Sequence, residues 1–261
     1  MNKIKNITVI GTGVIGTGWI LRFLAFNKKV TAYDPSVKQK DYLKKELKRT
    51  KSSIEKLYNK KINIKNLVFS SNIEDAVSKA DLIQENVPER LELKKKVINQ
   101  LSQFAPKNCI IASSSSGLLP SELQSNCINP KRFIIAHPFN PVYILPLVEI
   151  VKGNKTSKII MNEADKFYKN LHMKTLIVNK ELPGFLSDRL QEALWREGLH
   201  IINDGYATTK DLDEAITYGP GMRWALMGTF LTFHLAGGEL GMKHMLDQFG
   251  PALKLPWTKL K

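Results

Sequence analysis

The stretch Ile7-Thr-Val-Ile-Gly-Thr-Gly-Val-Ile-Gly16 joins an apolar run to three glycines at a fixed spacing. The apolar residues predict a buried strand, and the residues after Gly13 predict a helix. Gly11 is expected to make a tight turn, Gly13 to let a diphosphate approach the backbone, and Gly16 to let the helix pack closely. A helix N-terminus attracts anions, so the pattern predicts a pyrophosphate site. Its expected cofactor-binding residues are Gly11, Thr12, Gly13, Val14, Ile15 and Gly16.

A second predicted strand, Val30-Thr-Ala-Tyr, ends at Asp34. An acidic residue about 20 positions past such glycines holds the 2′-hydroxyl of a ribose. The carboxylate of Asp34 would repel a 2′-phosphate, and therefore the sequence favours NAD over NADP. The alternative to a dinucleotide-binding motif is a glycine turn in another kind of α/β domain.

Composition and length indicate a globular protein that buries a core. The 261 residues are 43% hydrophobic and allow one large or two modest domains. No apolar run reaches the roughly 18 residues of a membrane span, and the N-terminus has no signal-peptide pattern, so we expect a cytoplasmic protein. Cys109 and Cys127 form no CxxC pair and have no nearby histidine, so neither a metal site nor a disulfide is expected.

The net charge of +15 is concentrated in the first part of the chain. Residues 38–65 contain ten lysines and Arg49. Such a run can bind an anionic partner, or it can be the solvated face of a helix. It lacks interleaved aromatic residues and no nucleic-acid motif accompanies it, which favours the solvated helix and no nucleic-acid partner.

Predicted strands and helices alternate as far as the strand Thr175-Leu-Ile-Val, which is typical of a doubly wound parallel sheet of the Rossmann type. Pro183-Gly184-Phe185 then interrupts the chain, and the pattern becomes helical throughout. We therefore predict an NAD-binding domain over residues 1–182 and a smaller all-helical domain over residues 183–261.

The helical part has four recognisable segments. Residues 186–204 are predicted as a long helix, and Thr208 is predicted to cap a second helix over residues 211–216. Gly219-Pro-Gly-Met222 is predicted as a turn. Residues 224–235 are apolar on nearly all faces, which predicts burial at a domain or subunit interface.

His137 is the candidate general base. It lies at the carboxyl end of the predicted strand Arg132-Phe-Ile-Ile-Ala-His137, and the next strand, after a turn with two prolines, carries Glu149. A neutral imidazole accepts a proton best when a carboxylate fixes its tautomer. The alternative for His137 is a packing role. Ser116 is a candidate substrate contact or an ordinary turn residue, and Glu89 is a candidate site residue or a helix N-terminal charge.

Five motifs in fixed order resemble the 3-hydroxyacyl-CoA dehydrogenase family over nearly the whole chain. They are the glycine motif, Ala112-Ser-Ser-Ser-Ser116, His137-Pro-Phe-Asn-Pro141, Pro146-Leu-Val-Glu149 and Pro183-Gly-Phe185. The resemblance implies an NAD-dependent 3-hydroxy dehydrogenase with His137 as proton acceptor, oriented by Glu149. It places Ser116 and Asp188 near the substrate oxygen, where Asp188 replaces an asparagine. It also implies cofactor contacts from Glu89, Lys94 and Asn140.

Three segments of the helical half, residues 188–200, 222–230 and 249–257, are similar to the members of this family that oxidise L-carnitine. Aromatic faces bind a trimethylammonium group. The aromatic candidates, which are alternatively ordinary helix core, are Tyr143, Trp195, Trp224, Phe230 and Phe233, and Arg196 and Arg223 are candidates for the carboxylate.

Two further substrate classes stay open, another small 3-hydroxy acid and a short-chain 3-hydroxyacyl-CoA. A third reading is a non-catalytic, crystallin-like dinucleotide-binding protein. The resemblance implies a homodimer through the helical domain. Family members continue well beyond Lys254-Leu-Pro-Trp257, so we expect the helical domain to be shortened at its C-terminus.

Overall fold

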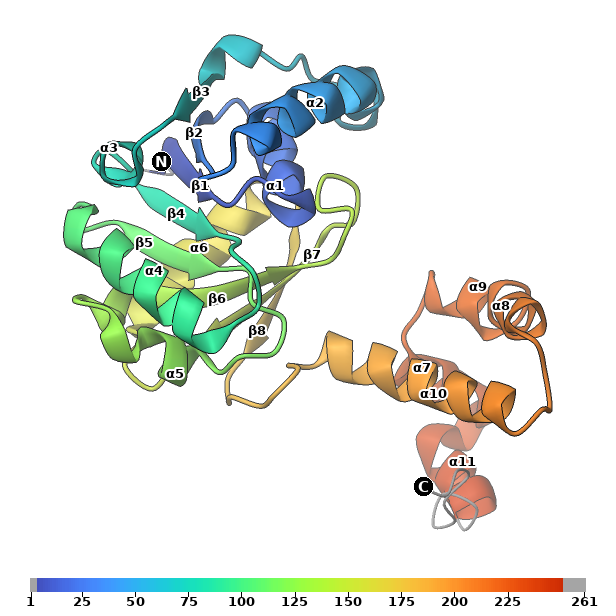
Figure 1. The fold of residues 1–261 in the computed structure, drawn as a ribbon. Helices are drawn as coiled ribbons and strands as arrows, with labels where there is room; N and C mark the ends of the chain where they lie inside the picture. The colour runs from blue at the N-terminus through green and yellow to red at the C-terminus, as the bar shows by residue number, and fades with distance from the viewer. Residues whose placement is uncertain (1–3, 251–261) are drawn as a thin grey trace. The chain divides into compact units, whose positions relative to one another are not determined.

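A computed structural model describes residues 4–250 of the chain (Figure 1). The chain divides into two compact units, the first ending at Asp188 and the second beginning at Arg189. The division between residues 182 and 183 expected from the sequence stays a prediction. Among the described residues, no helix is both long enough and apolar enough to cross a membrane.

Eight strands within residues 4–250 form one sheet in the order β3-β2-β1-β4-β5-β6-β7-β8. Strands β1 to β6 are parallel, as the glycine motif and the alternating pattern predict. This confirms the Rossmann-type doubly wound fold. The strands are β1 (Asn6–Ile10), β2 (Lys29–Tyr33), β3 (Leu67–Ser70), β4 (Leu82–Glu85), β5 (Ile110–Ser113), β6 (Phe133–Pro138), β7 (Leu147–Lys152) and β8 (Lys174–Val178).

The strand β7 pairs antiparallel with β6, and β8 pairs parallel with β7. The last two strands therefore run against the first six. The connection between β6 and β7, residues 139–146, contains Pro141 and Pro146 and is too short for a crossover helix. The chain must turn back on itself, which places β7 directly beside β6.

Helices cover both faces of the sheet, and each face has its own hydrophobic core. One core packs α1 (Val14–Ala25), α2 (Val37–Tyr58) and α6 (Lys158–Lys169) against the sheet. The other packs α3 (Ile73–Val77), α4 (Leu91–Phe104) and α5 (Pro120–Leu123). Figure 1 shows α4 in front of the sheet and α6 behind it. Because β1 to β6 are parallel, their carboxyl ends lie at a single edge of the sheet, between these two helix layers.

Two of these helices, α5 and α6, are absent from the sequence prediction. The signal for α6 is present: Ser157 caps the helix by accepting the N–H of Ile160, and buried apolar residues then recur at helical spacing. The short α5 begins with Pro120, whose fixed φ suits a first helical position.

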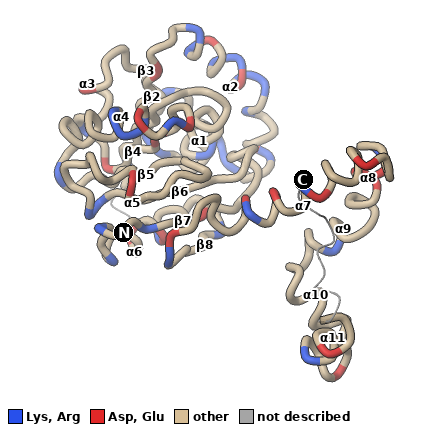
Figure 2. The backbone as a smooth tube through the Cα atoms, turned by 60° about the horizontal axis from the view of Figure 1, so that its bottom comes forward, with Lys and Arg blue, Asp and Glu red and all other residues tan. Residues whose placement is uncertain are grey.

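The lysine-rich segment forms α2, the solvated helix that the sequence favours, and Figure 2 shows Lys and Arg along it. Leu43, Leu47 and Ile54 are buried, while several basic side chains pair within the helix, as Arg49 does with Glu46 at 2.6 Å. Such pairs leave the charged side chains in water, which is the behaviour of a solvated helix face.

The buried Arg22 on α1 holds the β6–β7 connection. Its guanidinium donates to the carbonyl oxygens of Val142 (2.7 Å), Leu171 (2.9 Å) and Leu145 (3.1 Å). The side chain is fully buried, and burial lowers its pKa, an effect that the nearby Tyr58 partly opposes. A buried cation of this kind is tolerated because three carbonyl dipoles replace its water.

The second unit contains short helices, and α7 (Ser187–Asn203) leads into it. The predicted capping by Thr208 is confirmed, since Thr208 and Asp211 form a capping box at α8 (Thr209–Thr217). The predicted turn at Gly219 is wrong: α9 (Pro220–Trp224) begins there, with Pro220 in its first turn. The unit continues with α10 (Thr229–Ala236), the 3₁₀ turn η4 (Gly238–Leu240) and α11 (Gly241–Phe249).

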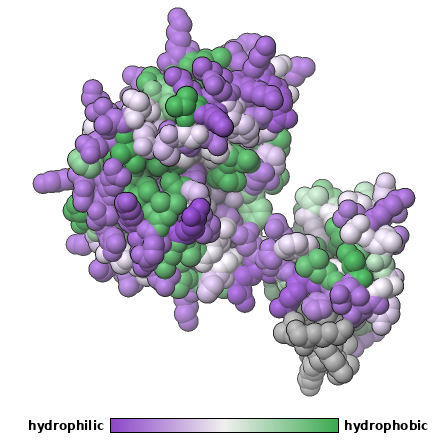
Figure 3. All heavy atoms as spheres, in the orientation of Figure 1, coloured by the Kyte–Doolittle hydropathy of each residue, from purple (hydrophilic) through white to green (hydrophobic). Residues whose placement is uncertain are grey.

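The apolar segment over residues 224–235 is largely exposed on the second unit taken by itself. Leu226 is 85% exposed and Phe230 is 84% exposed, and Figure 3 shows apolar surface on this unit. Ordinary monomer surfaces carry few such groups close together. The predicted burial at an interface is therefore not satisfied inside the unit, and the interface stays a prediction.

Replacing Arg22 should destabilise the first unit. Arg22→Met removes three hydrogen bonds and leaves buried carbonyl oxygens without donors, which we expect to lower the free energy of unfolding by about 2–4 kcal/mol. Urea denaturation measures the change. The matched control is Arg49→Met on the exposed face of α2, which should leave the unfolding midpoint nearly unchanged. Equal midpoints for the two variants would contradict the role given to Arg22.

Candidate active site

His137 and Glu149 face each other across the antiparallel pair of β6 and β7. The strand register places these two residues directly opposite one another. Directly opposed side chains lie on the same face of the sheet, so the imidazole and the carboxylate meet. Nδ1 of His137 lies 3.0 Å from Oε2 of Glu149, and both side chains are buried. The reversal of β7 therefore creates the pair that the sequence predicted.

The second oxygen of Glu149 is also occupied. Oε1 accepts the backbone N–H groups of Leu186 and Ser187, each at 3.0 Å. Since an ionised carboxylate only accepts hydrogen bonds, Nδ1 of His137 must be the donor in its contact. The neutral ring then keeps its lone pair on Nε2, which is the nitrogen that can act as a base.

The carboxyl of Glu149 is held in its ionised form. Burial raises its pKa, but the hydrogen bonds from His137, Ser187 and Leu186 outweigh burial, and the net effect lowers the pKa from the ordinary 4.5. Because the pKa of Glu149 is lower in the folded state, its ionised carboxyl stabilises the folded protein, and this stabilisation is complete above the ordinary value. The stabilisation is lost as the pH falls through the folded-state pKa.

Asp188 lies on the other side of the imidazole. Its Oδ2 is 3.7 Å from Nε2 of His137, and its side chain is 23% exposed. It follows directly after the two residues whose N–H groups Glu149 binds. Glu149 thus fixes both the ring of His137 and the chain that carries Asp188. Three of the predicted catalytic residues, His137, Glu149 and Asp188, are brought together.

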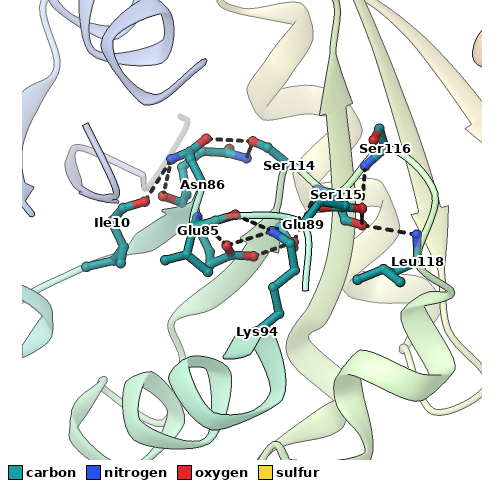
Figure 4. A network of polar contacts seen from close by, with 12 residues as sticks. Ile10, Glu85, Asn86, Glu89, Lys94, Ser114, Ser115, Ser116 and Leu118 are labelled. Carbon is teal, nitrogen blue, oxygen red and sulfur yellow. Dashed lines mark hydrogen bonds and ion pairs between the residues drawn. The ribbon is translucent and has the colours of Figure 1, made fainter. Parts of the chain in front are cut away.

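Ser116, the fourth, lies in the turn after β5, which Glu89 holds from the turn after β4 (Figure 4). Oε1 of Glu89 accepts the hydroxyl of Ser115 and the N–H groups of Ser116 (3.1 Å) and Gly117 (3.3 Å). Burial raises the pKa of Glu89, but the hydrogen bonds from Ser115, Gly117 and Leu118 and the charge of Lys94 lower it by more, so that the net shift is downward. Glu89 therefore orients the backbone that presents Ser116.

Lys94 is a buried cation between two carboxylates. Its Nζ donates to Oε1 of Glu85 at 2.8 Å and to the carbonyl of Val87 at 2.9 Å, and lies 3.4 Å from Oε2 of Glu89. Glu85 ends β4 and also accepts the hydroxyl of Ser113 on the neighbouring strand. The ammonium thus ties the ends of β4 and β5 together below the turn that carries Ser116.

A second network of polar contacts, largely buried, is centred on Ser114 in the turn after β5. The hydroxyl of Ser114 donates to Asn86 at 2.7 Å and accepts from Gln84 at 2.9 Å and from the indole of Trp19 at 3.0 Å. Gln84 in turn accepts the hydroxyl of Tyr168 at 2.7 Å. The network fixes the turn to α1 and α6.

The glycine loop offers space and polar groups for a dinucleotide. A Cβ on Gly11, whose φ is +80°, would lie 2.8 Å from a carbonyl oxygen, and one on Gly16 would lie 1.8 Å from the carbonyl oxygen of Gly11. Gly13 has open space around it. No side chain caps α1 and no acidic residue lies in its first turn, so no side chain neutralises the positive end of the helix dipole, where Val14 and Ile15 are the first helical residues. These features fit an anionic phosphate group.

Asp34 lies beside this loop at the end of β2. Its carboxylate accepts the N–H of Thr12 at 2.8 Å and that of Ser36 at 2.9 Å. It is thereby fixed next to the glycines, in the place where a ribose would be bound. The residues present fit NAD.

The connection after β6 carries two further predicted site residues. Asn140 is exposed and precedes Pro141 through a cis peptide bond. Tyr143 packs against the first core, and its carbonyl accepts the hydroxyl of Tyr58 at 2.9 Å. Their roles toward cofactor and substrate stay predictions.

The six remaining predicted substrate residues belong to the second unit, where all of them are exposed. They are Trp195, Arg196, Arg223, Trp224, Phe230 and Phe233. Trp195 is 60% exposed and Trp224 is 39% exposed, so neither is core of that unit. Their contact with a substrate stays a prediction.

Sequence reasoning missed Glu85, Ser115 and Gln84. A signal existed for Glu85, since a carboxylate that ends an apolar strand close to a lysine on the next helix needs a partner when buried. The roles of the backbone N–H groups of Leu186 and Ser187 have no side-chain signal at all.

Comparison with known proteins gives two family matches that together span nearly the whole chain. Residues 6–182 match "3-hydroxyacyl-CoA dehydrogenase, NAD binding domain", and residues 184–259 match "3-hydroxyacyl-CoA dehydrogenase, C-terminal domain".

The chain is similar to curated proteins over almost its full length. It is 56% identical to the L-carnitine dehydrogenase of Oceanobacillus iheyensis, covering 98% of this chain and 84% of that protein. It is 53% identical to the L-carnitine dehydrogenase of Bacillus cereus, covering 99% of this chain and 80% of that protein. Among solved structures it is similar to 5-formyl-3-hydroxy-2-methylpyridine 4-carboxylic acid 5-dehydrogenase, with a TM-score of 0.90, 26% identity, and 99% and 83% of the two chains covered.

Glu149→Gln should reverse the tautomer of His137. A glutamine has one side-chain oxygen for the three donors that Glu149 now satisfies. If that oxygen keeps the two backbone N–H groups, the amide NH₂ faces Nδ1, and the ring proton moves to Nε2. ¹⁵N NMR of the histidine ring reports the protonated nitrogen directly, and turnover should fall by roughly 10²–10⁴-fold.

The control for this variant is Glu163→Gln, which removes a half-exposed carboxylate that lies 3.6 Å from Arg132. It should leave the histidine spectrum unchanged. Acid titration adds a second test, because the wild type should lose stability below the ordinary carboxyl pKa by an amount that Glu149→Gln lacks. An Nδ1–H tautomer of His137 in both Glu149→Gln and Glu163→Gln would contradict the role of Glu149 in holding the ring proton on Nδ1.

Lys94→Met should destabilise the chain far more than Lys95→Met. The first change leaves the buried Glu85 without its cation, which we expect to lower the free energy of unfolding by about 3–5 kcal/mol. Lys95 is on the same helix but pairs with the exposed Glu92 at 3.3 Å, so its loss should have little effect. Chemical denaturation compares the two variants, and similar midpoints would show that the Lys94 cluster contributes little.

Proposed function

Since the chain belongs to the 3-hydroxyacyl-CoA dehydrogenase family and is an NAD-dependent 3-hydroxy dehydrogenase, we propose that its substrate is L-carnitine. The product would be 3-dehydrocarnitine. The observation that supports this substrate is the identity of 56% and 53% with two L-carnitine dehydrogenases over nearly the whole chain.

In the proposed reaction, Nε2 of His137 takes the proton of the 3-hydroxyl group. Glu149 keeps the proton of the resting ring on Nδ1 and then stabilises the imidazolium, because its carboxylate lies 3.0 Å away in a buried site. Ser116 is proposed to hold the substrate oxygen through its hydroxyl. Its backbone is already held by Glu89.

A bound NAD would supply the acceptor for the hydride that leaves carbon 3 of the substrate. The loop from Gly11 to Gly16 and the N-terminus of α1 are proposed to hold its diphosphate, and Asp34 its adenosine ribose. Glu89 and Lys94 are proposed to lie at the nicotinamide end, and Asn140 is proposed as a further cofactor contact. Buried ion pairs hold Glu89 and Lys94 in place, which favours a preformed site.

The helical unit is proposed to contribute to substrate binding and to a homodimer. Its exposed aromatic side chains, with Tyr143 of the first unit, are the groups that suit a trimethylammonium ion, and Arg196 or Arg223 suits a carboxylate. Its exposed apolar residues, such as Leu226, would gain from burial against a second copy. The cytoplasmic location stays a prediction from the sequence.

Side-by-side assays of NADH formation test the substrate. We expect turnover of L-carnitine, little of D-carnitine, and none of 3-hydroxybutyryl-CoA, at mildly alkaline pH where proton release favours oxidation. His137→Gln should reduce turnover of L-carnitine by roughly 10²–10⁴-fold while NAD binding, followed by tryptophan fluorescence, is kept.

The matched control is His172→Gln, because His172 lies in the loop before β8 and packs against Phe26. That variant should keep full turnover. Turnover of 3-hydroxybutyryl-CoA instead of L-carnitine would favour the acyl-CoA alternative, and NAD binding without turnover of either would favour a non-catalytic protein or another small hydroxy acid.

A further inference from the structure

Asp188 occupies a built position beside the reacting nitrogen. Glu149 binds the N–H groups of the two residues immediately before it, and Oδ2 of Asp188 lies 3.7 Å from Nε2 of His137. Leu186 and Ser187 are thereby fixed to the same carboxylate that fixes the ring. The distance between Asp188 and the base is therefore set by the active site and not by a loose loop.

The reaction places the substrate hydroxyl at Nε2, so the carbinol carbon must lie close to that nitrogen. In L-carnitine the ammonium nitrogen is only two bonds from this carbon. A carboxylate that borders Nε2 is then within a few ångströms of a permanent positive charge. The side chain of Asp188 is 23% exposed, so a bound substrate can reach it.

A trimethylammonium group has no N–H to donate, so hydrogen bonding cannot select it. Charge and apolar contact are the means that remain. Within the described residues of the first unit, Glu149 cannot serve this purpose, because it is fully buried and already accepts three hydrogen bonds. Asp188 is the carboxylate that both borders Nε2 and meets solvent.

We propose that Asp188 is a specificity-determining residue that selects 3-hydroxy acids carrying a cationic group on carbon 4. The inference rests on the proposed function, because it assumes that such a substrate is used. A purely structural role for Asp188 is the alternative, since a carboxylate in the first turn of α7 also stabilises that helix. The two roles differ in one respect: helix stabilisation does not depend on the charge of the substrate.

A pair of substrates of equal shape separates these roles. L-carnitine is compared with 3-hydroxy-5,5-dimethylhexanoate, in which a quaternary carbon replaces the ammonium nitrogen. The kcat/KM of both is measured with wild type and Asp188→Asn. Any general damage to the site affects both substrates alike, so the ratio of the two kcat/KM values isolates the response to charge.

We expect Asp188→Asn to reduce the preference for the cation by about 10- to 100-fold, the size of effect that loss of one close, partly screened charge pair produces. Asp188→Glu, which keeps the charge, should retain most of the preference. The matched control is Asp75→Asn, since Asp75 lies with the first residues of β1 and β2 at the opposite edge of the sheet. It should leave the preference unchanged.

Equal losses on both substrates would overturn the proposal and leave Asp188 with a structural or general catalytic role. A wild type that oxidises neither compound would instead contradict the proposed function, and this proposal with it. Circular dichroism and NAD binding establish whether each variant is folded. Asp188→Ser is the second neutral variant if Asp188→Asn does not fold, and its preference must fall in the same way.

Discussion

The carboxylate of Glu149 accepts three hydrogen bonds, and the arrangement of the site depends on them. One comes from the imidazole of His137 and two from the backbone at the start of α7. A buried carboxylate would be costly without such donors, and with them its pKa is lowered despite burial. The same contacts that make the buried charge tolerable also choose the tautomer of the base and place the next segment of the chain. Stability and chemical function are therefore not separable at this residue.

A second set of buried charges supports the opposite side of the site. Lys94 joins Glu85 to Glu89, and Glu89 holds the turn that presents Ser116. Each partner is buried or half-buried, so each needs the others for the loss of water to be compensated. Such a cluster has few alternative arrangements, which makes it suited to fixing backbone positions to a fraction of an ångström. Apolar packing alone would hold this turn less specifically.

Sequence could predict the fold because its signals were local. The glycine motif and the apolar strands each depend on neighbouring residues, and the doubly wound architecture follows from their order. The pairing of His137 with Glu149 could also be expected, because two prolines in a short connection force the chain to turn back. The turn predicted from Gly219 to Met222 is wrong, and a helix begins at Pro220, because Gly-Pro-Gly suits both a turn and a helix start. Local sequence does not separate the two.

What sequence could not supply were contacts made by backbone groups and by residues distant in the chain. The N–H groups of Leu186 and Ser187 have no side-chain signature, and Arg22 finds its carbonyl partners more than a hundred residues away. These contacts explain how two carboxylates beside one imidazole take different roles. Glu149 is buried in the core and accepts three hydrogen bonds, whereas the side chain of Asp188 is 23% exposed. Environment, and not residue type, thus distinguishes the two carboxylates: one is buried against the imidazole, and the other is open to solvent.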